Sequence, residues 1–277
     1  RLKILDNLKF FDDSINQPNI DLDTLYKGIC KLKIVDISLS RPEDNPQLIF
    51  ESLNSTGLEL SAADLIRNFL LMGLENDEQE HLYKKFWYPM EQSVTSDKTD
   101  DFDRFMKDFL TVKQTDIPIE KEVYQKYKEY FFEEEKTNSV YVEELHYYSK
   151  FFVWLLEKTD DREIKDAISN INILRVKPAY PFLLQVFSDY EKKIISKDNV
   201  LEIINLIQSY VFRRQIVGGT GTSGHNRTFA LLYSYVDKEN SQTYVESIKA
   251  ALIRKQDYER FPKDSEFSTE LRQAENV

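Results

Sequence analysis

Apolar residues recur at helical spacing along most of this sequence. Phe102, Phe105, Met106 and Phe109 follow the i, i+3, i+4, i+7 order that places side chains on one face of a helix. The same spacing returns at 123–130, 145–156, 164–174, 184–190 and 203–211, and we predict a helix over each stretch. Two further helices are predicted at about 227–236 and 242–254. The pattern indicates a mainly α fold with a multi-helical domain.

A different pattern occupies the region near the N-terminus. β-branched and other apolar residues alternate loosely over 32–40, which predicts a strand. Before it, Asp23 is positioned to cap a short helix over about 24–30. We therefore expect a small α+β remnant, with one or two strands, at the N-terminus of an otherwise helical chain.

Residues 46–74 predict two helices joined by a tight corner. Pro46 suits the first position of a helix, where a missing N–H costs nothing. Gly57 suits the left-handed conformation that ends one. Ser61 is placed to cap the second helix, with Asp64 three residues later in an acidic variant of the capping box. The polar corner around Asn54 either forms the turn or contacts a ligand, and turn chemistry alone favours the first reading.

Composition agrees with a helical fold and indicates where it divides. Seven Gly and eight Pro in 277 residues are too few for the many turns of a β-sandwich or barrel. The acidic, Ser/Thr-rich stretch 91–101 is the predicted linker. It would separate a mixed N-terminal domain over 1–92 from an all-helical connector domain over 93–277.

Charge and cysteine content narrow the class of protein. A formal net charge of −11 disfavours a uniform nucleic-acid surface, because phosphates would be repelled over most of it. The single cysteine, Cys30, excludes an intrachain disulfide and fits a reducing, cytoplasmic location. No apolar run approaches 18 residues, so no membrane partner is expected.

One region departs from the acidic average. From 205 to 263 the chain has nine Lys and Arg against five Asp and Glu, a net charge of +4. Four of the seven glycines fall at 218–224, just before a predicted helix, where backbone N–H groups can hold an anion. Arg213, Arg214 and Arg227 are the candidate phosphate or DNA contacts. The alternatives are a flexible surface loop and a basic face that meets the acidic part of the protein.

Candidates for catalysis and metal binding are few. His81, His146 and His225 stand at spacings that fit no metal site, and we expect each at the surface or at the edge of the core. Glu134 and Lys136 have the acid-x-Lys spacing of some nucleases, but a solvated helix end explains them better. We therefore predict no catalytic residue, no metal site and no cofactor site in this chain.

The segment IFESLNSTGLELSAADLIRNFLLM resembles a recurring segment of the GmrSD-type proteins, modification-dependent (type IV) restriction endonucleases and their relatives in phage defence. The residues that match include Asn54, Gly57, Asp64, Arg67 and Asn68. Two weaker likenesses follow in the same order. YVFRRQIVG with NRTFALL is similar to the family's central helical region, and RFPKDSEF is similar to the stretch before its nuclease domain.

This resemblance implies a division of labour within a longer protein. The family's N-terminal domain is of the ParB/sulfiredoxin-like kind, with an Asp-Gly-Gln-Gln-Arg signature associated with nucleotides, and its C-terminal domain is a His-Asn-His-like, metal-dependent nuclease. Neither signature occurs here. The resemblance therefore implies a catalytically inert fragment, comprising the end of the first domain and the helical connector. Its partners would be DNA and its own N- and C-terminal domains, and the nucleotide and divalent metal would belong to the full-length parent.

A second hypothesis comes from a different class of function. The net charge of −11 and the sixteen tyrosines also suit a helical protein–protein interaction module with no role on nucleic acid.

Overall fold

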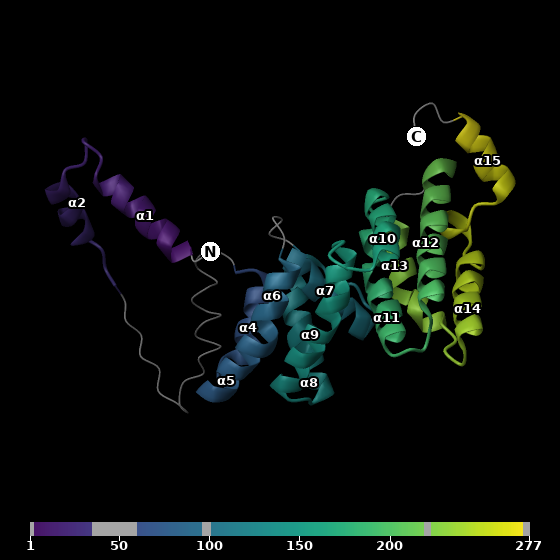
Figure 1. Ribbon diagram of the computed structural model, residues 1–277, viewed down its shortest axis with the longest axis horizontal. Coiled ribbons are helices and arrows are strands. Elements are labelled where there is room, and N and C mark those ends of the chain that lie inside the picture. The colour runs from purple at the N-terminus through teal and green to yellow at the C-terminus, as the bar shows by residue number, and fades with distance from the viewer. Residues whose placement is uncertain (1–2, 35–59, 96–100, 219–222, 274–277) are drawn as a thin grey trace. The chain divides into compact units, whose positions relative to one another are not determined.

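The computed structural model describes residues 3–34, 60–95, 101–218 and 223–273 (Figure 1). Regular secondary structure in these residues is helical throughout, so the predicted mainly α fold is confirmed. Of the predicted strand, residues 32–34 have no regular structure and 35–40 lie outside the described residues. The chain forms two compact units, Arg1–Asn45 and Pro46–Val277.

The first unit contains two amphipathic helices, α1 (Lys3–Ile15) and α2 (Leu22–Ile29). Asp21, rather than the predicted Asp23, caps α2, because its side chain accepts the backbone N–H of Asp23 at 3.1 Å. The large apolar side chains of both helices are exposed within this unit. Its two helices therefore do not bury a core of their own.

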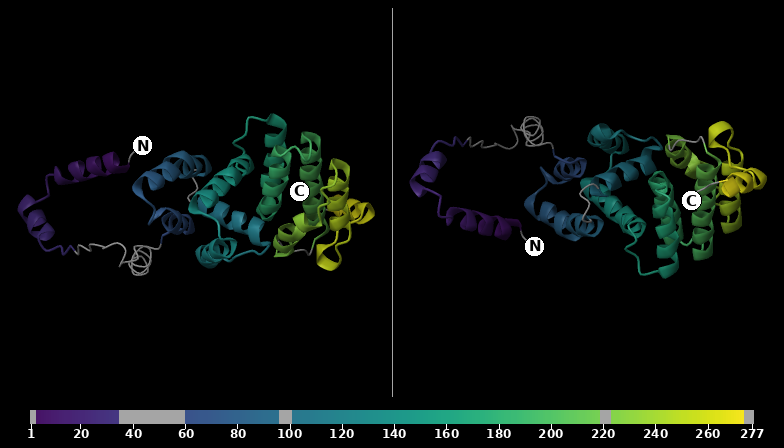
Figure 2. Two further views of the ribbon diagram at one scale, coloured as in Figure 1. Left: turned by 90° about the horizontal axis from the view of Figure 1, so that it is seen from below. Right: turned by 90° about the horizontal axis from the view of Figure 1, so that it is seen from above.

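The second unit is built from helices joined by short turns (Figures 1 and 2). Its helices are α4 (Ala62–Leu71), α5 (Asn76–Leu82), the π-helix η1 (Tyr83–Trp87), α6 (Tyr88–Val94), α7 (Asp101–Gln114), η2 (Glu120–Glu122), α8 (Val123–Glu134), α9 (Asn138–Leu155), α10 (Arg162–Ile173), η3 (Lys177–Ala179), α11 (Tyr180–Glu191), α12 (Lys197–Val217), α13 (Ser223–Leu232), η4 (Tyr233–Tyr235), α14 (Ser241–Ile253), η5 (Asp257–Glu259) and α15 (Asp264–Gln273).

Helix α11 lies at the centre of this unit. Every residue from Tyr180 to Asp189 is buried, as expected of a helix that neighbours surround. It packs against α7 and α9, which belong to the earlier part of the unit, and against α12 and α13, which belong to the later part. Figure 1 shows α11 between these two groups. One continuous apolar core therefore extends from α4 to α14.

The predicted boundary at 92/93 falls inside this unit rather than between units. Glu91 and Val94 belong to α6, and Asp101 begins α7. The rings of Trp87 and Phe102, one on each side of the predicted linker, meet edge to face with centroids 5.6 Å apart. The compact units instead divide at 45/46, and the assignment of 1–92 to a ParB/sulfiredoxin-like domain stays a prediction.

Three consecutive helices end in the same backbone motif. After α9, α10 and α11 the chain turns through a left-handed residue, with φ of 63° at Glu157, 56° at Arg175 and 61° at Lys193. In each turn the next N–H returns to a carbonyl five residues back, as from Lys158 to Val153. This is the Schellman motif, in which glycine is the usual left-handed residue. Because glycine is scarce in this chain, charged residues occupy these positions in a left-handed conformation that is unfavourable for them.

Helix starts in the second unit show the usual capping chemistry. Ser61 caps α4 and accepts the N–H of Asp64 at 3.1 Å, as predicted. Ser196 caps α12, and Asn199 completes a reciprocal capping box by accepting the N–H of Ser196. None of the helices described by the structure combines the length and the apolar character required to cross a membrane.

Candidate functional site

The helix that carries the family-like segment is tied to its neighbours by its own polar residues. On α4, the Arg67 guanidinium lies 2.9 Å from Asp64 and 3.4 Å from Glu91 on α6. Burial raises the pKa of Glu91, and the nearby Arg67 opposes that rise. The N–H of Ala63, in the first turn of α4, donates to Asp103 of α7 at 2.8 Å. Arg67 therefore connects α4 to α6, and Asp103 connects it to α7.

Of the remaining matched residues of the family-like segment, the structure describes one and leaves two outside the described ranges. Asn68 lies on α4 beside Arg67 and lines an open surface cleft of ≈ 470 Å³ with Tyr83. Asn54 and Gly57, the polar corner itself, lie outside the described residues. The structure therefore shows the packing of this segment from Ser61 onward.

Of the three predicted phosphate contacts, Arg213 is already engaged. Its guanidinium pairs with Asp264 of α15 and lies 4.8 Å from the centroid of the Phe267 ring. The ring of Phe212 meets Phe267 edge to face at 5.8 Å. Arg213 therefore fixes α15 to α12.

Arg214 is a core residue. Its side chain is 1% exposed, and its Nη1 donates to the hydroxyl of Tyr210 at 3.0 Å. Arg227, by contrast, lies at the surface on α13. The three arginines therefore do not form one exposed basic surface: Arg214 is buried, Arg213 is ion-paired, and Arg227 alone of the three is open to solvent.

The position of His225 differs from the prediction. It was predicted at the surface or at the edge of the core, but it is 4% exposed, and its Nε2 has no hydrogen-bond partner among the described residues. Burial, assisted by the charge of Arg214, lowers its pKa to about 4. His225 is consequently neutral at physiological pH.

A cleft on α7 contains a group of charged residues that the sequence analysis did not single out. Its volume is ≈ 390 Å³, and Arg104, Lys107 and Lys177 are among the residues that line it. Beneath them lies the carboxylate of Asp108, which is 2% exposed. Nε of Arg104 donates to its two oxygens at 2.9 and 2.8 Å. We call this site the α7 cleft.

The electrostatics of Asp108 reflect this position. Burial raises its pKa to about 6, while Arg104 and then Lys107 and Lys177 oppose the rise. Three cations therefore act on a single carboxylate that is only partly ionised near pH 6.

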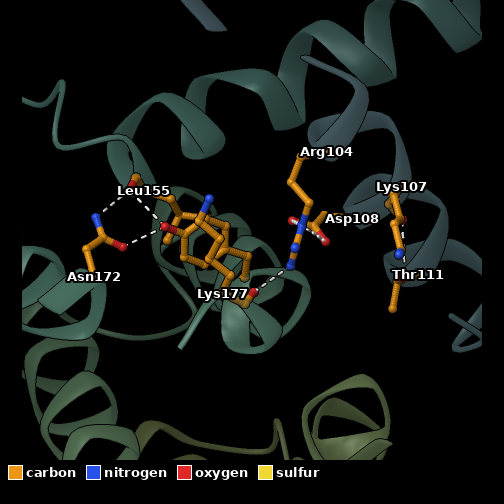
Figure 3. Close-up of polar contacts among 8 residues, drawn as sticks. Arg104, Lys107, Asp108, Thr111, Leu155, Asn172 and Lys177 are labelled. Carbon is orange, nitrogen blue, oxygen red and sulfur yellow. Dashed lines mark hydrogen bonds and ion pairs between the residues drawn. The ribbon is translucent and has the colours of Figure 1, made fainter. Parts of the chain in front are cut away.

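The turn after α10 places the other wall of the cleft. The Schellman motif at Arg175 ends α10 and leads directly into η3, whose first residue is Lys177. The carbonyl oxygen of Lys177 accepts Nη2 of Arg104 at 2.8 Å, and Figure 3 shows Arg104 reaching between Asp108 and this carbonyl. One guanidinium thus connects α7 to η3.

A second cleft adjoins the first, because Asp101 and Lys177 line both. Its volume is ≈ 600 Å³, and Lys158 and Arg175 are among its cationic residues. Its floor is fixed by the Tyr180 hydroxyl, which donates to Asn172 Oδ1 at 2.6 Å, while Asn172 donates to the carbonyl of Leu155 at 3.0 Å (Figure 3).

Sequence reasoning missed this site for a definable reason. Arg104 and Asp108 stand four residues apart, which resembles an ordinary ion pair on the solvent face of a helix. The burial of Asp108 comes from η3 and α11, which are more than 65 residues distant in sequence.

In the part of the chain that the structure describes, no three His, Cys, Asp or Glu side chains gather where they could hold a metal ion. Comparisons with protein-family models, with curated proteins and with solved structures found no match to this chain.

Proposed function

We propose that this chain is the helical positioning region of a DNA-targeting restriction endonuclease of the GmrSD type, with catalysis performed by other domains. The observation that carries this proposal is the ion pairing of the charged residues on α4. Arg67, a charged residue of the family-like segment, pairs with Asp64 of the same segment and with Glu91 of α6. A segment whose charges are committed to helix packing serves architecture rather than chemistry.

The packing around α4 supports the same proposal. α4 contacts α7, α8 and α9, and Asn138 of α9 donates to the carbonyl of Leu70 near its C-terminus. A helix that packs against several neighbours has a fixed position in the core. The role we assign to α4 is to hold the described end of the family-like segment, from Ser61 onward, against the helical core.

Two measurements on the purified chain test the proposal. We expect no cleavage of plasmid DNA with Mg²⁺ or Mn²⁺ and nucleotide, because the catalytic groups would reside elsewhere. We expect salt-dependent binding of a labelled duplex, since phosphate contacts release counterions. Arg227→Ala should weaken that binding and lower the salt slope by roughly one. Arg162→Ala, at a side chain 92% exposed on α10, is the matched control. Metal-dependent cleavage by the chain would contradict the proposal.

The second candidate, a helical protein-interaction module, is favoured by one observation. In the first unit, α1 and α2 present large apolar side chains to solvent, among them Leu8, Phe11 and Leu25. Exposed apolar faces of this kind mark surfaces that bind other proteins. Absence of duplex binding at low salt, together with self-association or partner binding lost in Leu8→Asp, would favour this candidate over the first.

A further inference from the structure

We propose that the α7 cleft binds a phosphate group, held by Lys107, Lys177 and the open edge of the Arg104 guanidinium. This proposal does not depend on the proposed function, because it concerns a different surface from Arg227 and holds for a phosphate of any origin.

The cations of the cleft have unused binding capacity. Arg104 uses Nε on Asp108 and Nη2 on the carbonyl of Lys177, which leaves Nη1 without a hydrogen bond to any described residue. Lys107 and Lys177 line the cleft, and neither forms an ion pair within the described ranges of the chain. Lysine and arginine donors of this kind bind phosphate oxygens with charge-assisted hydrogen bonds.

The acids that share the cleft are directed elsewhere. Asp103 accepts the N–H of Ala63 and thereby caps α4. Asp101 is the first residue of α7, and Glu120 is the first residue of η2. Acids in the first turn offset the positive end of a helix dipole. Within the described ranges of the chain, none of these acids forms an ion pair with Lys107 or Lys177.

The buried carboxylate increases the positive character of the site as pH falls. Asp108 is faced by Arg104 and Lys107 from its own helix and by Lys177 from η3, and its charge raises the pKa of the Tyr180 phenol on α11. With a pKa of about 6, Asp108 loses its charge at mildly acidic pH. Arg104 is then left uncompensated and attracts an anion more strongly.

The space fits more than a single phosphate. The α7 cleft and its neighbour measure ≈ 390 and ≈ 600 Å³, which lies within the range of small-molecule sites. Arg175 adds a further cationic side chain to the second cleft, whereas the Lys158 ammonium donates to the carbonyls of Ser93 and Thr95. Two phosphates in sequence, from a nucleoside diphosphate or from a nucleic-acid backbone, match the two adjoining clefts.

The test uses pyrophosphate and a short DNA duplex as separate probes, at low ionic strength, by calorimetry for the first and fluorescence anisotropy for the second. The variant is the double substitution Lys107→Met and Lys177→Met, which keeps the aliphatic stems and leaves the Arg104–Asp108 pair intact. The matched control is Lys150→Met with Lys165→Met, which removes the same charge from exposed positions on α9 and α10.

We expect the wild-type chain to bind pyrophosphate in a 1:1 ratio, the variant to bind it at least tenfold more weakly, and the control to stay within about twofold. If the variant loses affinity for the duplex and the wild type has none for pyrophosphate, the phosphate comes from nucleic acid. The proposal is overturned if the variant binds both probes like the wild type, or if the wild type binds neither.

A second measurement tests Arg104 without removing it. Sulfate keeps its charge between pH 5.5 and 7.5, so any change in its affinity reports on the protein. We expect its affinity to rise several-fold as pH falls over this range, and the rise to be smaller in Asp108→Asn. Equal rises in the two proteins would place the anion away from Arg104 and overturn the role given to that side chain.

Discussion

Tyr244 donates its hydroxyl hydrogen to Oδ2 of Asp189 at 2.9 Å, although 55 residues separate the two in sequence. The Tyr233 hydroxyl donates to the same oxygen at 2.7 Å. The carboxylate is 2% exposed and raises the pKa of both phenols, in addition to the effect of their burial. One acid on the central helix therefore connects α11 to η4 and to α14.

Asp189→Ala should destabilise the fold by roughly 2–4 kcal/mol, because two buried hydroxyls lose their acceptor. Urea unfolding followed by circular dichroism measures the change. Asp166→Ala is the control for the same substitution at the surface, where Asp166 lies 3.8 Å from Arg162 and both side chains are exposed. That variant should change stability by less than about 0.5 kcal/mol, and equal losses in the two variants would contradict the structural role of Asp189.

The pKa of Asp108 predicts a pH dependence of stability. The value is about 6 in the folded chain against 3.8 for the free group, so the folded state binds the proton more tightly. The stabilisation is fully present below about pH 3.8 and is lost as pH rises through 6, by roughly 3 kcal/mol in all. Asp108→Asn cannot ionise and should lack this component.

Urea unfolding at intervals from pH 4 to 7 isolates the effect as the difference between wild type and Asp108→Asn. His225 acts in the opposite direction, because its pKa is lowered to about 4 and its contribution disappears as pH falls, but it is present in both proteins and cancels. Identical pH profiles would show that Asp108 ionises normally in the fold.

The docking of α15 provides a prediction about local stability. None of the residues of α15 is buried, and Arg213 supplies both an ion pair and a ring contact to it. Arg213→Ala should speed hydrogen exchange of α15 amides by roughly five- to tenfold, in line with a contact of about 1 kcal/mol. Exchange in α11 should not change. Protection of α15 equal to wild type would mean that other contacts hold the helix.

The helices were predictable from sequence because their apolar residues repeat at helical spacing. Phe102, Phe105, Met106 and Phe109 were assigned to one buried face, and all four are buried. Caps with a local signal, such as Ser61, were predictable for the same reason. Local patterns determine these features, and a window of a few turns contains all the information required.

The site was not predictable in the same way. The pKa of Asp108 and the burial of Arg214 depend on helices distant in sequence, and no local pattern distinguishes them from surface charges. Arg213 and Arg214 are adjacent in sequence, yet one pairs with Asp264 and the other lies in the core. A helix rotates each successive residue by about 100°, so neighbours in sequence face different surroundings.

The left-handed helix ends make a further prediction possible. Lys193 holds φ at 61°, whereas its neighbour Lys192 has φ of −76°. Lys193→Gly should stabilise the fold by about 0.5–1 kcal/mol, because glycine adopts the left-handed conformation without a Cβ clash. Lys192→Gly, the control, should destabilise it by a similar amount. Thermal unfolding measures both, and the same sign for both would contradict the explanation.

Arg175 occupies the equivalent position after α10, but it also borders the cationic cleft next to Lys177. Glycine at residue 175 would relieve the same Cβ clash, but it would also remove a positive charge from the border of the cleft. The two left-handed positions therefore differ in what a glycine would change. At residue 193 glycine would raise thermal robustness without affecting the cleft. At residue 175 the same gain in robustness would be accompanied by weaker binding.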